Sequence, residues 1–557
     1  MQPFGLTSTD AIELLLAVVL AAMAFVWQPW LGPLAGRLAA NKRLCIVVIA
    51  ALPLILRLAL LAAHPVPIPA NYDEFSHLLV ADTLLHGRLA NPAHPMARFF
   101  ETFFVLQEPT YSSIYPVGLG FSLAVGKLLF GLPWAGVLLT TGTFCGACYW
   151  MLRGWTTPEW ALAGGVLAVS IYGPLSPWMN TYWGGSWTAT AGCLVFGALP
   201  RLREIPSVRN GAVLGLGLAM HVLSRPFESV FLLLAVLFWL GARHYRLMVI
   251  AALVMLPALG ITLLQNKRVT GEWLTSPYVL SQRQYGVPAA LSFQANPVPQ
   301  RALTPGQELD YRMQASFRPG GRETVPTWFT RLLTRIRSYR FYFTPALYIA
   351  LAAFLLSFWR DPGHRFLVGV CLLFALGTNF FPAFRYHYVA GIVCLFILLS
   401  LEGLRRLPPP AARWLLGIAL VHFTFWYGAH TAEGAVTAWD TWNGINHGGS
   451  PRAEVATELD AIPGDLLVFV RYWPGHIFQD EWVWNEADID HARVIFARDL
   501  GDGDNRTLLR HYQGRTVLLL EPDARPARLS AWIPEEPVPA PPRSTPRVPQ
   551  IPFEPVR

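Results

Sequence analysis

Long apolar runs, separated by short loops that carry arginine or lysine, recur along this chain as far as about residue 430. A run of about twenty apolar residues is long enough for a helix to cross about 30 Å of hydrocarbon. Hydrophobic residues make up 53% of the 557 residues and charged residues only 14%, which excludes an ordinary soluble protein. The sequence therefore predicts an α-helical protein that crosses a membrane many times.

The positive charge follows the short loops between the apolar runs. The formal net charge is +8, but no basic helix or nucleic-acid-binding motif accompanies it, so we expect no nucleic-acid partner. The positive-inside rule places these loops in the cytoplasm if residues 116–132 form a helix in the membrane plane and do not span it. The loops lie near residues 37–43, 153, 201–209, 243–246, 360–365 and 405–413.

With that choice the chain has about twelve spans, and both termini lie outside. Residues 1–43 hold an extra N-terminal span, near 11–27, and a cytoplasmic loop. Residues 44–429 form the main transmembrane domain. Its spans are expected near 44–63, 134–152, 159–177, 186–200, 211–224, 227–241, 247–264, 342–359, 366–381, 386–401 and 414–429. The six cysteines all lie in apolar segments, which predicts core packing.

After the last span the composition becomes that of a soluble α/β domain, expected over residues 450–532. The short apolar runs 466–470, 494–497 and 517–520 predict buried strands of a small parallel sheet. The acidic and aromatic segment 472–490 is either an acceptor or partner surface or simply a decorated surface. The proline-rich tail, 533–557, predicts an extended or disordered segment.

An acidic pair, Asp73-Glu74, follows the span at 44–63 and therefore lies outside the membrane. A carboxylate pair in a loop that also holds His77 and ends at Tyr115 suits general-base or metal chemistry at the membrane surface. The alternative is that Asp73 only caps a short helix. Inside that span lies Arg57, which we expect to extend outward to the interface, with contact to a buried anion as the alternative.

Three further outer segments converge on the same face as Asp73. The aromatic turn 178–185 contains Asn180 and either grips a sugar or anchors at the headgroups. Arg225 either pairs with Glu228 within its own turn or contacts a phosphate. Arg385 and Tyr386 precede a late span, where a lipid phosphate would lie. In the long outer loop, arginines alternate with apolar residues and predict an interfacial helix facing anionic headgroups or a pyrophosphate: Arg331, Arg335, Arg337 and Arg340.

Together these motifs resemble the GT-C membrane glycosyltransferases, which include protein O-mannosyltransferases and lipid A aminoarabinose transferases. The resemblance covers roughly residues 44–401. It rests on the outward Asp73-Glu74 pair, the Tyr115-Pro116 helix start, the turn Leu223-Ser224-Arg225-Pro226 and the late Arg385-Tyr386. The chain departs from the pattern at Asn180, where many members carry another acid, and in its extra N-terminal span.

The resemblance implies transfer of a sugar from a polyprenyl-phosphate donor to a lipid, glycan or protein acceptor. Asp73 matches the general base and Glu74 its orienting or metal-binding partner, with a divalent cation as the one cofactor that this pair suggests. The expected substrate-binding residues are Arg225, Arg385, Tyr386, His77, Asn180 and Tyr115.

The resemblance also implies a multi-pass protein of the cell's inner membrane with an extracytoplasmic C-terminal domain. Two other classes stay open: a transporter, and a non-catalytic subunit of a surface-polysaccharide assembly system. A transporter would carry ionisable residues deep in several spans, whereas the charges here gather on one face.

Overall fold

The computed structural model describes residues 35–533, except 242–243, 319–320, 322, 345 and 433–449, and four isolated helical positions before residue 35. The expected span near 11–27 and the proline-rich tail from residue 534 therefore lie outside the described residues, as does the link at 433–449.

Helices coincide with the apolar runs that predicted them from residue 44 onward. They are α2 (Lys42–Ala59), α5 (Pro133–Leu152), α6 (Pro158–Tyr172), α8 (Ser186–Glu204), α9 (Val208–Val222), α10 (Pro226–Leu240), α11 (Tyr245–Thr270), α15 (Leu347–Leu355), α16 (Pro362–Thr378), η7 (Tyr386–Ile392) with α17 (Val393–Leu404), and α18 (Pro409–Ala432). Several extend beyond the apolar run, because backbone hydrogen bonds continue into polar residues. All six cysteines are buried, as core packing predicts.

Three of the described helices are long and apolar enough to cross a membrane by length and composition: Pro133–Leu152, Tyr245–Thr270 and Tyr386–Leu404. Several others are shorter than a full crossing of about twenty residues. One such case is the expected span at 342–359, which contains only the nine residues of α15 as regular α-helix. The count of twelve spans therefore stays a prediction.

Basic side chains gather at one end of the helical body. Arg201 donates to the carbonyl oxygen of Trp150 at 2.8 Å, which joins the ends of α8 and α5. Arg203 donates to the carbonyl oxygen of Trp239 at 2.7 Å, near the end of α10. Arg405, after α17, donates to Thr156. Loops that are far apart in sequence thus share what we call the basic end, and the positive-inside rule requires such an arrangement.

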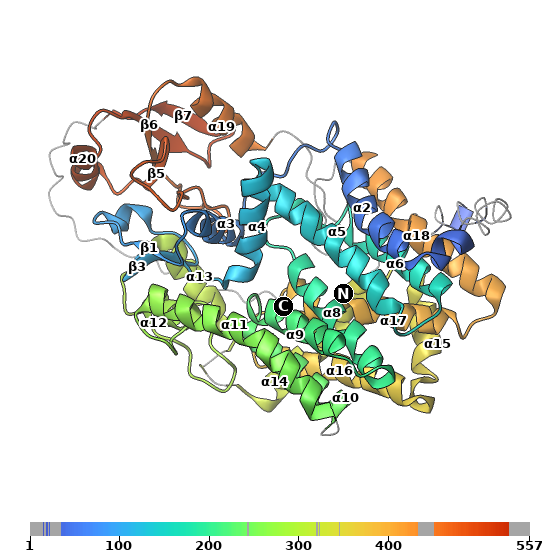
Figure 1. Cartoon of the computed structure of the whole chain (residues 1–557). Helices are drawn as coiled ribbons and strands as arrows, with labels where there is room; N and C mark the ends of the chain where they lie inside the picture. Colours follow the sequence, from blue (N-terminus) through green and yellow to red (C-terminus); the bar gives the residue numbers. More distant parts are fainter. Residues whose placement is uncertain are drawn as a thin grey trace.

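Helix α4 (Val117–Phe130) has both of its ends at the opposite end of the body. The N–H of Gly118 donates to the carbonyl oxygen of Leu223, next to the turn before α10. After α4 the chain turns at Gly131 into α5, whose Trp134 indole donates to the carbonyl oxygen of Met179. A helix in the membrane plane would have this arrangement. In Figure 1, α4 lies between α3 (Tyr72–Leu85) and the start of α5.

The outer segments form structure of their own around this end of the body, which lies opposite the basic end, holds α3 and is called the α3 end below. Between α3 and α4 lie the 3-10 helix η2 (Ala97–Phe100) and an antiparallel sheet of β1 (Asn91–Pro92), β3 (Thr110–Ser113) and β2 (Val105–Leu106), in that order. The long loop after α11 folds into α12 (Pro277–Tyr285), α13 (Pro305–Ser316), α14 (Val325–Ser338) and η5 (Tyr339–Tyr342), and η6 (Phe358–Arg360) follows α15.

The C-terminal unit is a four-stranded sheet with the order β5-β4-β6-β7, and it begins with α19 (Pro451–Ala461). The strands β4 (Leu466–Val470), β5 (Val494–Arg498) and β6 (Thr516–Glu521) fall on the three predicted runs, and β4 pairs in parallel with both neighbours. Helix α20 (Asp502–His511) connects β5 to β6, and β7 (Arg528–Ala531) adds an antiparallel edge. Figure 1 shows this unit against α3 and the small sheet.

Hydrogen bonds tie the C-terminal unit directly to α3. The buried carboxylate of Asp82 accepts from the N–H of Ala487 at 2.7 Å and from Lys127 of α4 at 3.1 Å. The indole of Trp484 donates to the carbonyl oxygen of Phe75. Lys127, the charged residue of α4, is thus neutralised by a partner on α3.

The expectation that Arg57 extends outward to the interface is wrong. Its side chain is fully buried and donates to Oδ1 of Asn180 at 2.8 Å and to the carbonyl oxygens of His64 and Pro65. The guanidinium also lies over the Trp134 ring. A charged group can stay buried here because oxygen acceptors and an aromatic face replace its water.

Candidate active site

A cavity of about 1560 Å³ opens at the α3 end, between the helical body, the outer helices and the C-terminal unit. It is bordered by all eight residues that the sequence proposed for the site. They are Asp73, Glu74, His77, Tyr115, Asn180, Arg225, Arg385 and Tyr386. These residues come from separate outer segments of the chain, so only the folded arrangement brings them together.

The start of α3 fixes the acidic pair. The Asn71 side chain caps the helix, and Glu74 completes a capping box by accepting from the N–H groups of Asn71 and Ala70 through Oε2. The other oxygen of Glu74 accepts from the N–H of Tyr182 at 2.9 Å. These three backbone bonds occupy the Glu74 carboxylate, so in this structure it holds the helix start to the 178–185 turn. Among the described residues no hydrogen bond joins Glu74 to the Asp73 carboxylate, and the expected orienting or metal-binding role of Glu74 stays a prediction.

Asp73 directly precedes Glu74 in the first turn of α3, and its side chain borders the cavity. The hydroxyl of Tyr115 donates to its Oδ1. Burial raises the pKa of Asp73 to about 6, and the Tyr115 bond and the positive charge of Arg385 limit the rise. A carboxyl group with a pKa in this range can take up and release a proton near neutral pH.

His77, one turn further along α3, lies flat against Tyr115 with ring centroids 4.2 Å apart. Burial lowers the pKa of His77 to about 3, so the ring is neutral at physiological pH. Its Nδ1 atom is buried and has no hydrogen-bond partner among the described residues. A neutral imidazole with an unused ring nitrogen is suited to bind a hydroxyl group of a ligand.

Two arginines supply positive charge to the same cavity. Arg225 precedes α10, lies 4.0 Å from the carboxylate of Glu228 and packs over the Tyr388 ring. The turn therefore does pair with itself, which was the plainer of the two expectations, although the contact is at the limit of an ion pair. Arg385 is exposed to the cavity with Trp183 6.0 Å from its guanidinium carbon. Both charges lower the pKa of Asp73, so both act at the carboxylate.

Asn180 borders the cavity, but its side-chain amide is occupied by the protein. Its oxygen accepts from Arg57, and its nitrogen donates to the carbonyl oxygens of Pro174 and Ser176 at 2.8 and 2.9 Å. With 2% of its surface exposed, this residue fixes the 178–185 turn against α2. The structure thus gives Asn180 a supporting role beside the cavity, and its contact with substrate stays a prediction.

The C-terminal unit provides one wall that the sequence indicated only in outline. Part of the acidic and aromatic segment, namely Ile477, Gln479, Asp480 and Trp482, borders the cavity together with Arg452 of α19. The Arg452 guanidinium donates to Asp480 at 2.7 Å and lies over the Trp482 ring. A polar and aromatic wall of this kind therefore faces the helical body across the cavity.

A second buried acid, Asp310 on α13, was not predicted from the sequence, and it does not itself border the cavity. This aspartate is completely buried, its Oδ1 accepts from Gln314, and its Oδ2 has no partner among the described residues. Burial raises the pKa of Asp310 to about 7, and the negative charge of Asp73 adds to the rise. Only the capping box of α13, at Thr304 and Gln307, marked this helix in the sequence.

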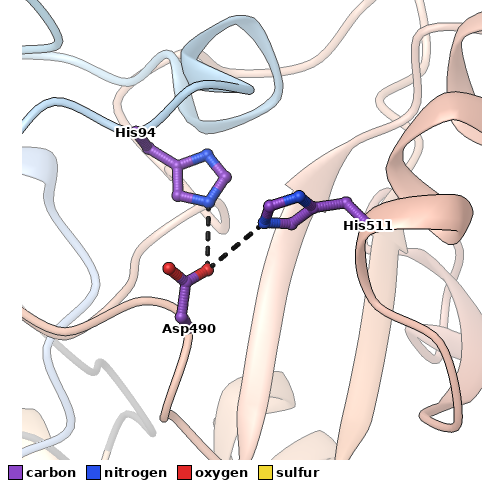
Figure 2. A group of neighbouring side chains, drawn as sticks. All are labelled: His94, Asp490 and His511. Carbon is purple, nitrogen blue, oxygen red and sulfur yellow. Dashed lines mark hydrogen bonds and ion pairs between the residues drawn. The ribbon is translucent and has the colours of Figure 1, made fainter.

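Within the part of the chain that the structure describes, one group of side chains is spaced to hold a metal ion: His94, Asp490 and His511. Figure 2 shows Asp490 between the two histidines, where its Oδ1 lies 3.1 Å from His94 Nε2 and 3.7 Å from His511 Nε2. The group joins the loop before β2 to the C-terminal unit, and its members do not border the cavity.

Hydrogen bonds already fill this cluster. The N–H of Met96 donates to His94 Nδ1 at 2.9 Å, so a neutral His94 carries its proton on Nε2, which faces Asp490. The Tyr512 hydroxyl donates to Asp490 at 2.6 Å. A cation bound to His94 Nε2 would require the proton to move to Nδ1 and the Met96 bond to break. In this structure the cluster is a hydrogen-bonded contact between the segment of His94 and the C-terminal unit.

No protein-family model matches the chain, and no curated protein matches it. It is similar to the solved structures of ArnT from Cupriavidus metallidurans, in the apo state (11% identity, TM-score 0.48) and bound to undecaprenyl phosphate (12%, 0.46). Each match covers 86% of this chain and 92% of that one.

The oligosaccharyltransferase of Archaeoglobus fulgidus in its apo form is also similar, with 12% identity and a TM-score of 0.44 over 78% of this chain. The match spans 62% of the length of that enzyme. These structures belong to the GT-C group that the sequence motifs resemble.

Proposed function

We propose that the protein is a membrane glycosyltransferase that moves a sugar from a polyprenyl-phosphate donor to a lipid, glycan or protein acceptor. The reaction would take place at the extracytoplasmic face of the inner membrane. The observation that carries the proposal is the buried Asp73 carboxylate beside a large cavity that also contains Arg225 and Arg385. A base and two cations in one cavity suit a reaction in which an acceptor loses a proton and a phosphate leaves.

In this reaction the acceptor hydroxyl gives its proton to Asp73 as its oxygen forms a bond to the anomeric carbon of the sugar. Oδ1 of Asp73 is held by Tyr115, which leaves Oδ2 to accept the proton. The bond between the anomeric carbon and the phosphate oxygen breaks, and the polyprenyl phosphate keeps the electron pair. The guanidinium groups of Arg225 and Arg385 stabilise the charge that remains on it.

The remaining cavity residues have roles in binding. The unused Nδ1 of His77 is available to a sugar hydroxyl, and Tyr386 lies next to Arg385 at the phosphate side. Glu74 and Asn180 hold the two turns that frame the cavity. The acceptor would enter along the C-terminal wall, where Trp482 and Asp480 present aromatic and polar surface.

The donor atoms at Asp73 do not form a divalent-cation site. Such a cation prefers several oxygen ligands, but the Glu74 oxygens are bound to three N–H groups and Asp73 Oδ1 is bound to Tyr115. In the proposed reaction, residues of the chain alone therefore supply the base and the positive charge. Among the described residues, the group spaced to hold a cation is the His94 cluster, and it does not border the cavity.

The deciding experiment is Asp73→Asn, assayed by consumption of a polyprenyl-phosphate-linked sugar in membranes with equal amounts of each protein. Loss of a general base should lower the rate by roughly two to four orders of magnitude. Asp460→Asn, on the exposed side of α19, is the matched control and should keep its rate. Activity of Asp73→Asn within a few-fold of wild type would remove Asp73 as the base and favour a transporter or an assembly subunit.

A further inference from the structure

Helix α14 has Arg331 and Arg335 on the face opposite its most exposed apolar side chains, and these two arginines face inward, whereas Arg337 is exposed. Val325, Phe329, Leu333 and Ile336 are 70%, 54%, 66% and 41% exposed, whereas Arg335 is only 3% exposed. In a helix on the surface of a soluble protein these faces would be reversed. The sequence-based expectation that the α14 arginines face lipid headgroups is therefore wrong for Arg331 and Arg335.

The inward face packs against the outer half of α16 and the segment after it. Asn379 donates to the carbonyl oxygen of Trp328, and the Tyr339 hydroxyl donates to the carbonyl oxygen of Cys371. Helix α14 therefore runs antiparallel to the last turns of α16. Its inner side also carries Thr334, Arg335 and Ser338 to the wall of the cavity.

One nitrogen atom of Arg335 lies within hydrogen-bond distance of three successive backbone carbonyl oxygens. Its Nη2 lies 2.7 Å from the oxygen of Phe381, 3.0 Å from that of Pro382 and 2.8 Å from that of Ala383. The guanidinium packs over the Phe384 ring at 4.5 Å. The next residue in the chain is Arg385, followed by Tyr386 and His387, and all three border the cavity.

We propose that Arg335 is a positioning residue that fixes the 381–388 segment and thereby aims Arg385 into the cavity. This inference rests on the proposed function only in naming the ligand, a polyprenyl phosphate. This segment follows α16 and has no regular secondary structure until η7 begins at Tyr386, so side-chain bonds contribute to holding residues 381–385. A buried guanidinium with three carbonyl acceptors makes charge-assisted bonds, which are stronger than neutral ones.

The test compares Arg335→Gln with Arg331→Gln, its control on the same helix. Arg331 also faces inward, but it binds Asn379 and Glu323 and leaves the carbonyl groups of 381–383 untouched. Hydrogen exchange of peptides from 384–392 is measured on the full-length protein in detergent or nanodiscs. Loss of the three bonds should speed exchange by about tenfold in Arg335→Gln and change it less than about twofold in the control.

A second measurement is binding of undecaprenyl phosphate. Arg335→Gln should weaken it about tenfold, Arg331→Gln should bind as wild type, and Arg335→Lys should restore part of the loss because an ammonium can donate several bonds but cannot pack flat on Phe384. Unchanged exchange at 384–392 in Arg335→Gln would overturn the positioning role. Failure of the wild-type protein to bind the lipid would count against the proposed function instead, and the exchange result would still decide the role of Arg335.

Discussion

The hydroxyl of Tyr115 donates a hydrogen bond to Oδ1 of Asp73, from a residue 42 positions further along the chain. This bond favours the ionised carboxylate, while burial acts in the opposite direction and dominates. The balance leaves the carboxyl group with a pKa of about 6. Several properties of the protein should depend on that balance.

The rate of transfer should fall at acidic pH. A general base acts only when ionised, so kcat/KM should drop about tenfold per pH unit below the Asp73 pKa of about 6 and level off above it. In Tyr115→Phe the acid limb should move to higher pH, because the bond that lowers the pKa of Asp73 is lost. Donor consumption between pH 5 and 8 measures both. A flat profile in the wild-type protein would argue against Asp73 as the base.

Asp73→Asn should make the protein more stable at neutral pH. The folded-state pKa lies above that of an unfolded aspartate, so the folded protein binds more protons between about pH 4 and 6 and the ionised group costs stability above that range. Asparagine keeps the bond from Tyr115 without the buried charge. The gain, on the order of 3 kcal/mol at pH 8, should vanish near pH 4. Thermal unfolding at several pH values tests this, and equal melting temperatures at pH 8 would contradict it.

Glu74→Gln should have the opposite effect on stability. The Glu74 carboxylate accepts hydrogen bonds from three backbone N–H groups. In glutamine one of the two oxygens becomes an NH2 group, which cannot accept, so at least one of these N–H groups would lose its acceptor. Buried N–H groups without acceptors cost about 1–3 kcal/mol each. The melting temperature should therefore fall, although Glu74 is the direct neighbour of Asp73, whose Asp73→Asn variant is expected to be stabilised. A stable Glu74→Gln protein that had lost transfer would instead revive a direct catalytic role for Glu74.

The α3 end and the basic end should lie on opposite sides of the membrane. Arg268, at the end of α11, and Glu204, at the end of α8, are both exposed. We expect a membrane-impermeant maleimide to label Arg268→Cys in intact cells or spheroplasts, and to label Glu204→Cys only after the membrane is opened. Labelling of both positions from outside would remove the in-plane assignment of α4 and the placement of every later helix.

Much of this arrangement could be predicted from local pattern. The apolar runs gave helices such as α5 and α9 within a few residues, and short apolar runs gave β4, β5 and β6. The eight proposed site residues meet at one cavity because they all lie in segments assigned to the same side by loop charge. That assignment needs only the order of the spans.

The errors concern side chains whose surroundings come from distant parts of the chain. Arg57 is buried because Asn180, 123 positions away, accepts its hydrogen bond, and no local feature marks that pair. In α14, arginines and apolar residues alternate at helical spacing, which shows two faces but not which one faces inward. Asp310 stayed unnoticed for the same reason, since its burial depends on how α13 packs.

The bonds from Ala487 and Trp484 to α3 bear on how the protein is made. Helix α3, which carries Asp73, is synthesised early. Two other residues of α3, Asp82 and Phe75, accept these bonds from a unit that is synthesised more than 400 residues later. The cavity wall formed by Arg452 and Trp482 arrives at the same late stage. In a cell, the helices inserted first would therefore lack this wall until the later unit is synthesised, and a chain that ended before Arg452 would leave the cavity open on that side.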